Sequence, residues 1–245
     1  LSDTVLGRRN LLTYSEDLSN AVWIKVRSSI IANAANDPSG AATYDKLVED
    51  TSATVTHSFY CAPFVAGTQY TVAIDIKADT RNSVFIICGQ NDNQGLVFNA
   101  STNVFSSVGS GITNNTATLL SNGAYRVSFT VAPANNVFQI YLHNGTTATY
   151  TGDGVSGLYI GRLQVELGVI ATDYQKITNA PAYCTLARAT AEGVTFTENT
   201  EITAPYNIAP AFSFNADVAI FNRALTATEK ALITRYMQRA VPLLG

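Results

Sequence analysis

Hydrophobic and polar residues alternate with a period of two in several segments of this chain. The clearest example is Gln69–Ala78, in which the two kinds of residue occupy opposite parities. One parity holds Tyr70, Val72, Ile74 and Ile76, and the other holds Thr71, Ala73, Asp75 and Lys77. Because successive side chains of a strand point to opposite faces, this pattern predicts a half-buried β-strand.

Three further segments predict strands by the same alternation: Tyr125–Val131, Val137–His143 and Gly157–Leu167. The alternation in the last segment changes phase near Gly161, which predicts a β-bulge there. Its expected buried residues are Leu158, Ile160, Leu163, Val165 and Leu167. Turn-forming clusters such as Asn122–Gly123 separate the strand-like segments, and this arrangement predicts an all-β sandwich or barrel.

The regular alternation ends near Thr178, where Asn179 and Pro181 interrupt it. We therefore expect a β-domain over residues 1–178 and a C-terminal extension over residues 179–245.

The extension contains one more strand-like segment, residues 212–221, followed by the best helix candidate, residues 227–240. Thr226 is a suitable N-cap, and Glu229 three residues later completes a capping box. Apolar residues at helical spacing form a stripe beyond it. That stripe is expected to pack on the sheet of its own chain or on a neighbouring subunit.

The composition narrows the classes of partner. Charged residues make up 13% of the 245 residues, and the formal net charge is -3. Nucleic-acid binding depends on Lys and Arg neutralising phosphates, so nucleic acid is not an expected partner. Apolar runs such as Val84–Cys88 are far shorter than a membrane span, and no membrane insertion is expected. We expect a soluble protein without a secretion signal, and Leu1 is taken as a cut in a longer chain.

The residues that most often carry metal or nucleophilic chemistry are few. The spacing of Cys61, Cys88 and Cys184 matches neither a zinc site nor a small disulfide framework, which favours buried free thiols. The two histidines, His57 and His143, have no further Cys or His at ligand spacing, so each is expected to be a surface or sheet-face residue. The single Trp23 is expected to be a core residue.

The carboxylates leave two alternatives open, a glycosidase site and a structural calcium site. Asp75 and Glu166 could share a sheet face, as the two acids of a glycosidase must share a cleft, but ordinary surface carboxylates are the favoured interpretation. No catalytic residue, cofactor or metal is assigned. A structural calcium ion is the other alternative. Its donors would be Glu16, Asp17, Asp153 and Glu166.

A set of motifs in shared order carries a family resemblance. They are NLLTYSEDLSNAVW (10–23), YDKLVED (44–50), AGTQYTVAIDIKA (66–78), NGAYRVSFTV (122–131), YTGDGVSGLYIGRLQVELG (150–168) and ATDY (171–174). Residues 9–178 resemble the jelly-roll modules of phage tail proteins and head fibres, which are similar to carbohydrate-binding modules of glycanases. The segment that begins at Asp217 resembles the last strand and short helix of a laminin-G or concanavalin-A-like lectin domain. The fold class implied is a jelly-roll β-sandwich with a C-terminal strand and short α-helix.

The strand pairing implied by the resemblance brings one set of polar side chains to one outer face, where they would bind a carbohydrate. Aromatic rings stack on sugars, while amides and charged groups bind hydroxyls. The expected set is Asp75, Lys77, Arg126, Gln139, Tyr141, His143 and Gln164. The alternative is that this face is merely solvated or is buried between subunits.

The resemblance implies a non-enzymatic protein of the virion surface, made in the host cytoplasm and part of a tail or head fibre. It would be a homotrimer that contacts other virion proteins and binds bacterial surface polysaccharide without cleaving it. Two alternatives remain: a purely structural fibre or capsid-decoration protein, and, with less support, a glycan-degrading or esterase enzyme.

Overall fold

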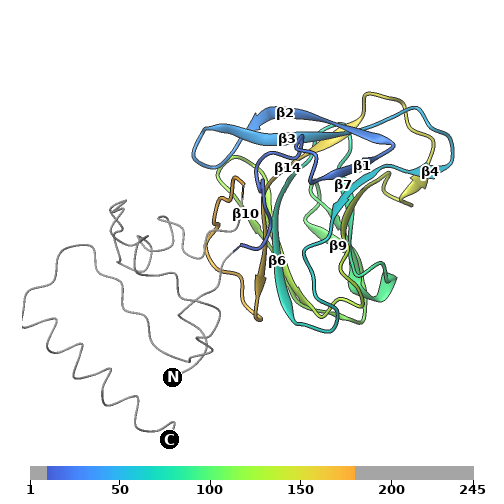
Figure 1. Ribbon diagram of the computed structural model, residues 1–245. Helices are drawn as coiled ribbons and strands as arrows, with labels where there is room; N and C mark the ends of the chain where they lie inside the picture. Colours follow the sequence, from blue (N-terminus) through green and yellow to red (C-terminus); the bar gives the residue numbers. More distant parts are fainter. Residues whose placement is uncertain (1–9, 180–245) are drawn as a thin grey trace, which may run out of the picture. The chain divides into compact units, whose positions relative to one another are not determined.

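The computed structural model describes residues 10–179, which are nearly all β structure with one short 3-10 helix, η1 (Asp92–Gln94). Two six-stranded antiparallel sheets face each other as a sandwich (Figure 1). The prediction of an all-β sandwich is confirmed for this part of the chain. The extension expected beyond Asn179, with its strand and helix, lies outside the described residues. No helix in residues 10–179 has the length and apolar character to cross a bilayer.

Along the sequence, the chain crosses several times between the two main sheets after forming one to three strands in one of them. Sheet A has the order β1 (Ile24–Val26), β5 (Ser58–Cys61), β12 (Phe138–His143), β7 (Ser83–Cys88), β8 (Gly95–Asn99) and β9 (Val104–Val108). Sheet B has the order β10 (Ile112–Leu119), β11 (Tyr125–Val131), β6 (Tyr70–Lys77), β14 (Gly157–Leu167), β3 (Ala42–Glu49) and β2 (Ser28–Asn36). A two-stranded sheet pairs β4 (Val55–Thr56) with β13 (Thr149–Tyr150).

The hydrophobic core lies between the two sheets. Trp23 is 1% exposed, packs edge-on against Phe59 with ring centroids 5.4 Å apart, and donates from Nε1 to the carbonyl oxygen of Tyr14 at 3.0 Å. Its predicted role as a core residue is confirmed. Cys61 and Cys88 are buried free thiols, as predicted, and burial raises both pKa values. Cys184 lies outside the described residues.

The strand predictions agree closely with the structure. Strands β6 and β12 lie inside the predicted segments, and β11 and β14 coincide with them. The register of β14 against β6 shifts between Gly161 and Gln164, and Arg162 adopts φ 49°, so the predicted bulge is confirmed. The prediction that Leu167 is buried is wrong. It is 50% exposed because the strand ends there.

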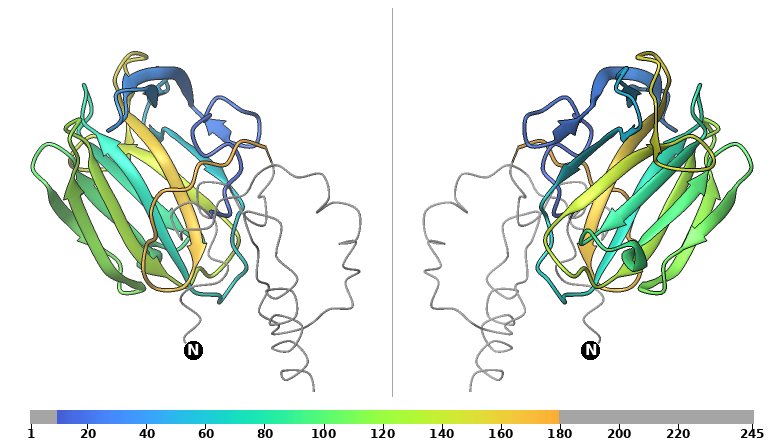
Figure 2. Two further views of the ribbon diagram at one scale, coloured as in Figure 1. Left: turned by 90° about the vertical axis from the view of Figure 1, so that its left-hand side faces the viewer. Right: turned by 90° about the vertical axis from the view of Figure 1, so that its right-hand side faces the viewer.

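Strand β6 corrects a second expectation. It is buried on both faces, since Thr71, Ala73 and Asp75 are all at most 2% exposed. The segment that follows β14, residues 168–178, turns back along the outer side of sheet B (Figure 2). Period-two alternation indicates which side chains share a face, but not whether another part of the chain covers that face.

The start of β14 generates a stability prediction. A Cβ atom at Gly157 would lie 2.0 Å from the carbonyl oxygen of Leu47 on β3. Gly157→Ala is therefore expected to lower the free energy of unfolding by about 2 kcal/mol or more, because the strand must shift. Gly123→Ala is the matched control. Its φ is +79° but no atom lies within 4 Å of the added carbon, and its cost should be about 1 kcal/mol. Urea denaturation measures both, and equal losses would contradict the predicted close contact.

Candidate functional site

The structure divides the seven expected sugar-binding residues between the two sheets. Asp75 and Lys77 (β6), Arg126 (β11) and Gln164 (β14) lie in sheet B. The remaining three, Gln139, Tyr141 and His143, all lie on β12 of sheet A. The expectation of one shared face is wrong because β11 and β12 belong to opposite layers, so their outward parities point away from each other.

On sheet B, Asp75 is fully buried at the centre of a charged cluster. Its carboxylate accepts hydrogen bonds from the Tyr44 hydroxyl at 2.5 Å and from Arg126 Nη1 at 2.9 Å. Arg162 Nη1 lies 3.4 Å from the same carboxylate. Arg126 also donates to the carbonyl oxygen of Arg162. The two arginine side chains are 16% and 24% exposed, so the cluster opens little to solvent.

Tyr174 connects this cluster to the segment that covers sheet B. The guanidinium carbons of Arg126 and Arg162 lie 5.6 Å and 5.0 Å from the centre of its ring, which are cation–π distances. Its hydroxyl is 2.8 Å from Ser15 Oγ. Burial raises the pKa of Tyr174, with a further contribution from the carboxylate of Glu16. The ring therefore stays neutral between the two cations and the opening segment.

Gln164 and Glu166 hold the same segment further along β14. Glu166 is fully buried and accepts hydrogen bonds from the Thr172 amide and hydroxyl, each at 2.8 Å, and from Gln164 Nε2 at 2.8 Å. Gln164 Oε1 accepts from the Gln175 amide at 2.8 Å. Asp75, Arg126 and Gln164 are therefore engaged within the molecule. Lys77 is half-buried at the end of β6.

The outer face of sheet A is different in character, because aromatic rings lie side by side on it. Tyr141 on β12 pairs with Phe85 on β7, and their rings are nearly parallel, with centroids 5.6 Å apart and an interplanar angle of 25°. On the other side of β12, Gln139 pairs with Tyr60 of β5. The three rings are each partly exposed, whereas Gln139 and His143, on the same side of β12 as Tyr141, are only 9% and 7% exposed. We call these five residues together the aromatic face: Tyr60, Phe85, Tyr141, Gln139 and His143.

Polar groups of the aromatic face are fixed by their neighbours. Gln139 Nε2 donates to Ser58 Oγ at 2.9 Å, which orients the amide. His143 Nδ1 accepts from the Gly145 amide at 3.1 Å, so the proton of the neutral ring is on Nε2. Burial lowers the pKa of His143, and burial with the nearby Asp92 carboxylate raises the pKa of Tyr141. Near neutral pH both side chains are uncharged, and the Tyr141 hydroxyl keeps its proton.

Sequence reasoning missed two members of the aromatic face. They are Tyr60 and Phe85. Phe85 lies in the run Val84–Cys88, which is apolar at both parities, so alternation gives no signal for which side faces outward. Only the pairing of β7 with β12 places Phe85 beside Tyr141, and this long-range pairing cannot be read from the local sequence.

Neither carboxylate of the enzymatic alternative is exposed to a substrate. The interpretation of Asp75 and Glu166 as surface carboxylates is wrong, because both are 0% exposed and accept the hydrogen bonds described above. The two histidines have opposite parities: His57 lies between β4 and β5, and His143 is the last residue of β12. The expectation of a surface or sheet-face position is wrong for His57. His57 is fully buried with Nδ1 2.7 Å from the Arg27 carbonyl oxygen, whereas His143 lies on the outer face. Within residues 10–179, no group of three or more His, Cys, Asp or Glu side chains is placed to hold a metal ion.

The donors considered for calcium accept hydrogen bonds or pair with cations from this chain. Asp153 Oδ1 accepts from the Ser156 amide at 2.7 Å, and Glu16 forms an ion pair with Lys176 at 2.6 Å. Asp17 accepts from the Ser19 hydroxyl, and Glu166 is bound as described. These contacts shape turns and hold the covering segment.

A second buried ion pair lies where β3, β13 and the Tyr150–Gly157 connection meet. Glu49 is fully buried, and Arg81 donates to both of its carboxylate oxygens, from Nε at 2.8 Å and from Nη2 at 2.6 Å. The Tyr150 hydroxyl donates to the same carboxylate at 2.7 Å and the Asp153 amide at 3.0 Å. The cluster fixes the loop before β14.

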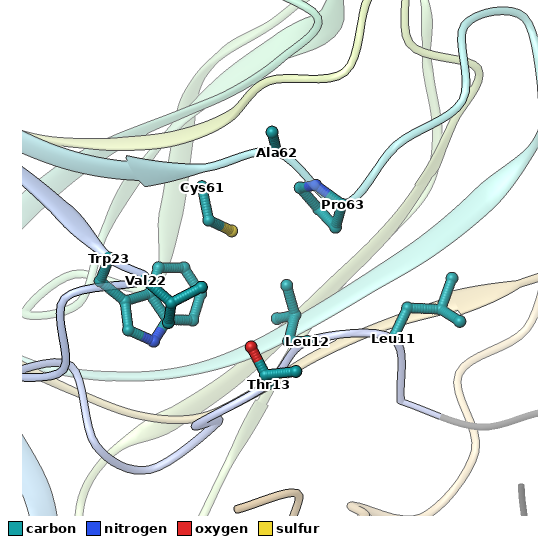
Figure 3. A pocket seen from close by; sticks show the side chains of 8 residues that line it. All are labelled: Leu11, Leu12, Thr13, Val22, Trp23, Cys61, Ala62 and Pro63. Carbon is teal, nitrogen blue, oxygen red and sulfur yellow. The ribbon is translucent and has the colours of Figure 1, made fainter. Parts of the chain in front are cut away.

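A small apolar pocket of about 120 Å³ lies between the opening segment and the residues after β5 (Figure 3). Its lining consists of Leu11, Leu12, Thr13, Val22, Trp23, Cys61, Ala62 and Pro63. Pockets for small-molecule ligands usually enclose about 300 Å³ or more and contain several polar groups. Thr13 alone supplies a side-chain hydroxyl here, so the pocket is a weaker candidate for a sugar than the aromatic face.

The chain was compared with known proteins. No family model matches it, and no curated protein matches its sequence.

The charged cluster on sheet B generates a stability prediction. Asp75→Ala leaves Arg126 and Arg162 without their buried counter-ion and should lower the free energy of unfolding by about 3 kcal/mol. The control is Asp173→Ala, an exposed carboxylate of the covering segment, expected within about 0.5 kcal/mol of wild type. Chemical denaturation of each variant gives the difference. An Asp75→Ala protein as stable as wild type would show that the cluster contributes nothing to folding.

Glu49 generates a pH prediction. Burial by itself raises its pKa, but hydrogen bonds from Arg81, Tyr150 and the Asp153 amide outweigh burial and bring the pKa below its usual 4.5. A lowered folded-state pKa stabilises the fold above the unfolded-state value, and this stability is lost as the pH falls through the folded-state pKa.

The free energy of unfolding should therefore decrease as the pH falls from about 5 to about 3, and Glu49→Gln should make that decrease smaller. Other carboxylates with lowered pKa values, such as Asp79, contribute equally to both proteins and cancel in the comparison. Urea unfolding at several pH values measures both slopes. Parallel slopes would show that Glu49 does not titrate as proposed.

Proposed function

We propose that this chain is a non-enzymatic, carbohydrate-binding jelly-roll module on the surface of a bacteriophage particle, within a tail or head fibre. It binds bacterial surface polysaccharide through the aromatic face of sheet A and does not cleave it. The observation that carries this proposal is the stacked pair Phe85 and Tyr141 beside Tyr60 and the fixed amide of Gln139.

The chemistry of the aromatic face supports a sugar ligand. The C–H groups on one side of a pyranose ring pack on a flat aromatic ring, while amide and imidazole groups bind its hydroxyls in defined directions. Gln139 and His143 supply such groups next to the rings. Each is positioned by a hydrogen bond within the protein, so little conformational entropy is lost when a ligand binds.

The outer face of sheet B is a poorer candidate for the sugar-binding surface, because residues 168–178 cover it. Arg126 binds Asp75 and packs on Tyr174 of the covering segment, and Gln164 accepts from the Gln175 amide of that segment. A sugar could therefore contact these side chains only after residues 168–178 had moved. A ligand that must displace bound protein groups loses the free energy of those contacts. Of the two outer faces in the described residues, sheet A therefore needs the smaller rearrangement.

A structural role is the second candidate, and one observation favours it. Ile24, which pairs with Tyr60 at the edge of sheet A, is 47% exposed and places an apolar side chain beside the aromatic rings. Such a surface also suits contact with a neighbouring subunit or another virion protein. In that case the sandwich serves assembly of a homotrimer and binds no glycan.

Binding to glycan arrays and to host cells tests the proposal. Tyr141→Ala and Phe85→Ala should each weaken binding about tenfold or more, equivalent to about 1.4 kcal/mol, because each removes a stacking ring. Tyr159→Ala is the matched control. It deletes an equally half-buried tyrosine on the outer side of β14 in sheet B and should bind as wild type does.

Light scattering and circular dichroism on the same samples separate the two candidate functions. A folded wild type that binds no glycan, together with loss of the oligomer in Tyr141→Ala, would support the structural role and contradict the proposal. Equal loss of binding in all three variants would show that the ligand does not depend on the aromatic face.

A further inference from the structure

The two sheets carry very different numbers of Asp, Glu, Lys and Arg side chains. The six strands of sheet A contain no Asp, Glu or Arg, and their only Lys is Lys25. The strands of sheet B contain Asp45, Lys46, Glu49, Asp75, Lys77, Arg126, Arg162 and Glu166. Charge is therefore concentrated in one layer of the sandwich.

Lys25 does not reach the outer face of sheet A. It pairs with Phe59, whose ring is in the core, so its side chain leaves the strand on the inner side of this edge. Its Nζ donates to the carbonyl oxygens of Ser19 and Asn20, both at 2.7 Å. The ammonium group is thus bound by the opening segment and lies away from Tyr141 and Phe85.

A negative charge acts on the aromatic face. The Asp92 carboxylate of η1 lies close enough to Tyr141 to raise the pKa of its hydroxyl, after the larger effect of burial. Burial lowers the pKa of His143, so its ring is neutral near neutral pH, with Nδ1 accepting from the Gly145 amide. No Lys or Arg of the six strands of sheet A balances Asp92 on this face.

We infer that the ligand of the aromatic face is a neutral glycan, one whose sugars carry hydroxyl or acetamido groups and no carboxylate, phosphate or sulfate. This inference rests on the proposed function. Proteins bind anionic sugar substituents through Arg or Lys, often with paired hydrogen bonds, and an anion placed among apolar rings without such a partner loses its hydration uncompensated. Asp92 adds repulsion to that cost.

The test uses two polymers that differ only in charge. One is a uronic-acid polysaccharide with the backbone of a glycan that the chain binds on the array. The other is the same polymer with its carboxyl groups reduced to primary alcohols. Ring shape and linkage are the same in both. The wild-type chain should bind the reduced, neutral polymer about tenfold or more tightly than its acidic parent, because only the acidic parent must desolvate an anion.

A charge-reversal variant sharpens the test. Asp92→Lys places a cation beside Tyr141 and should strengthen binding of the acidic polymer, with an effect that decreases as salt is added. Asp173→Lys makes the same change in net charge on the covering segment of sheet B and should leave both affinities as in wild type. If both variants act alike, net charge and not the aromatic face decides the preference.

The outcomes separate this inference from the proposed function. Tighter binding of the acidic polymer, still lost in Tyr141→Ala, would overturn the neutral-ligand inference and leave the aromatic face as the binding site. No binding of either polymer or of any arrayed glycan by a folded protein would overturn both.

Discussion

The buried carboxylate of Asp75 is the constraint on which the arrangement of the outer surfaces depends. A buried charge must be paired, and here two arginines and a tyrosine hydroxyl pair it. The same arginines pack on Tyr174, and so the cluster that neutralises Asp75 also holds residues 168–178 against sheet B. One outer face is closed by this arrangement, and the aromatic face of sheet A is the surface that we propose to bind sugars.

Concentration of charge in sheet B has a consequence for sheet A. Strands β5, β7 and β12 contain no Asp, Glu, Lys or Arg, so they place three aromatic rings on one outer face without a cation from these strands over the rings. The affinity of such a face rests on ring stacking and on a few neutral hydrogen bonds. We propose that this combination suits a module that holds a repeated polysaccharide weakly at each site and gains strength from several copies on one particle.

Local alternation was sufficient to predict strands β6, β11, β12 and β14 and the bulge near Gly161, and residue type was sufficient to predict the buried Trp23. Alternation did not predict which outer face each side chain lies on, because that depends on the pairing of strands far apart in the sequence. Asp75 and Tyr141 both have outward parity, but only the assignment of their strands to different sheets shows that they point in opposite directions. The burial of Asp75 depends on Tyr174, 99 positions later in the sequence, and the position of Phe85 beside Tyr141 depends on pairing across 56 positions. No window of a single strand contains that information.

The most direct measurement is an NMR titration of the isotopically labelled chain with a neutral oligosaccharide prepared from the bacterial surface polymer it binds. The account predicts that the largest chemical-shift changes fall on β5, β7 and β12, around Tyr60, Phe85, Gln139 and Tyr141, while residues around Tyr174 keep their positions. Shift changes centred on Arg126, Arg162 and Tyr174, or on the pocket beside Trp23, would contradict the assignment of the aromatic face as the binding surface.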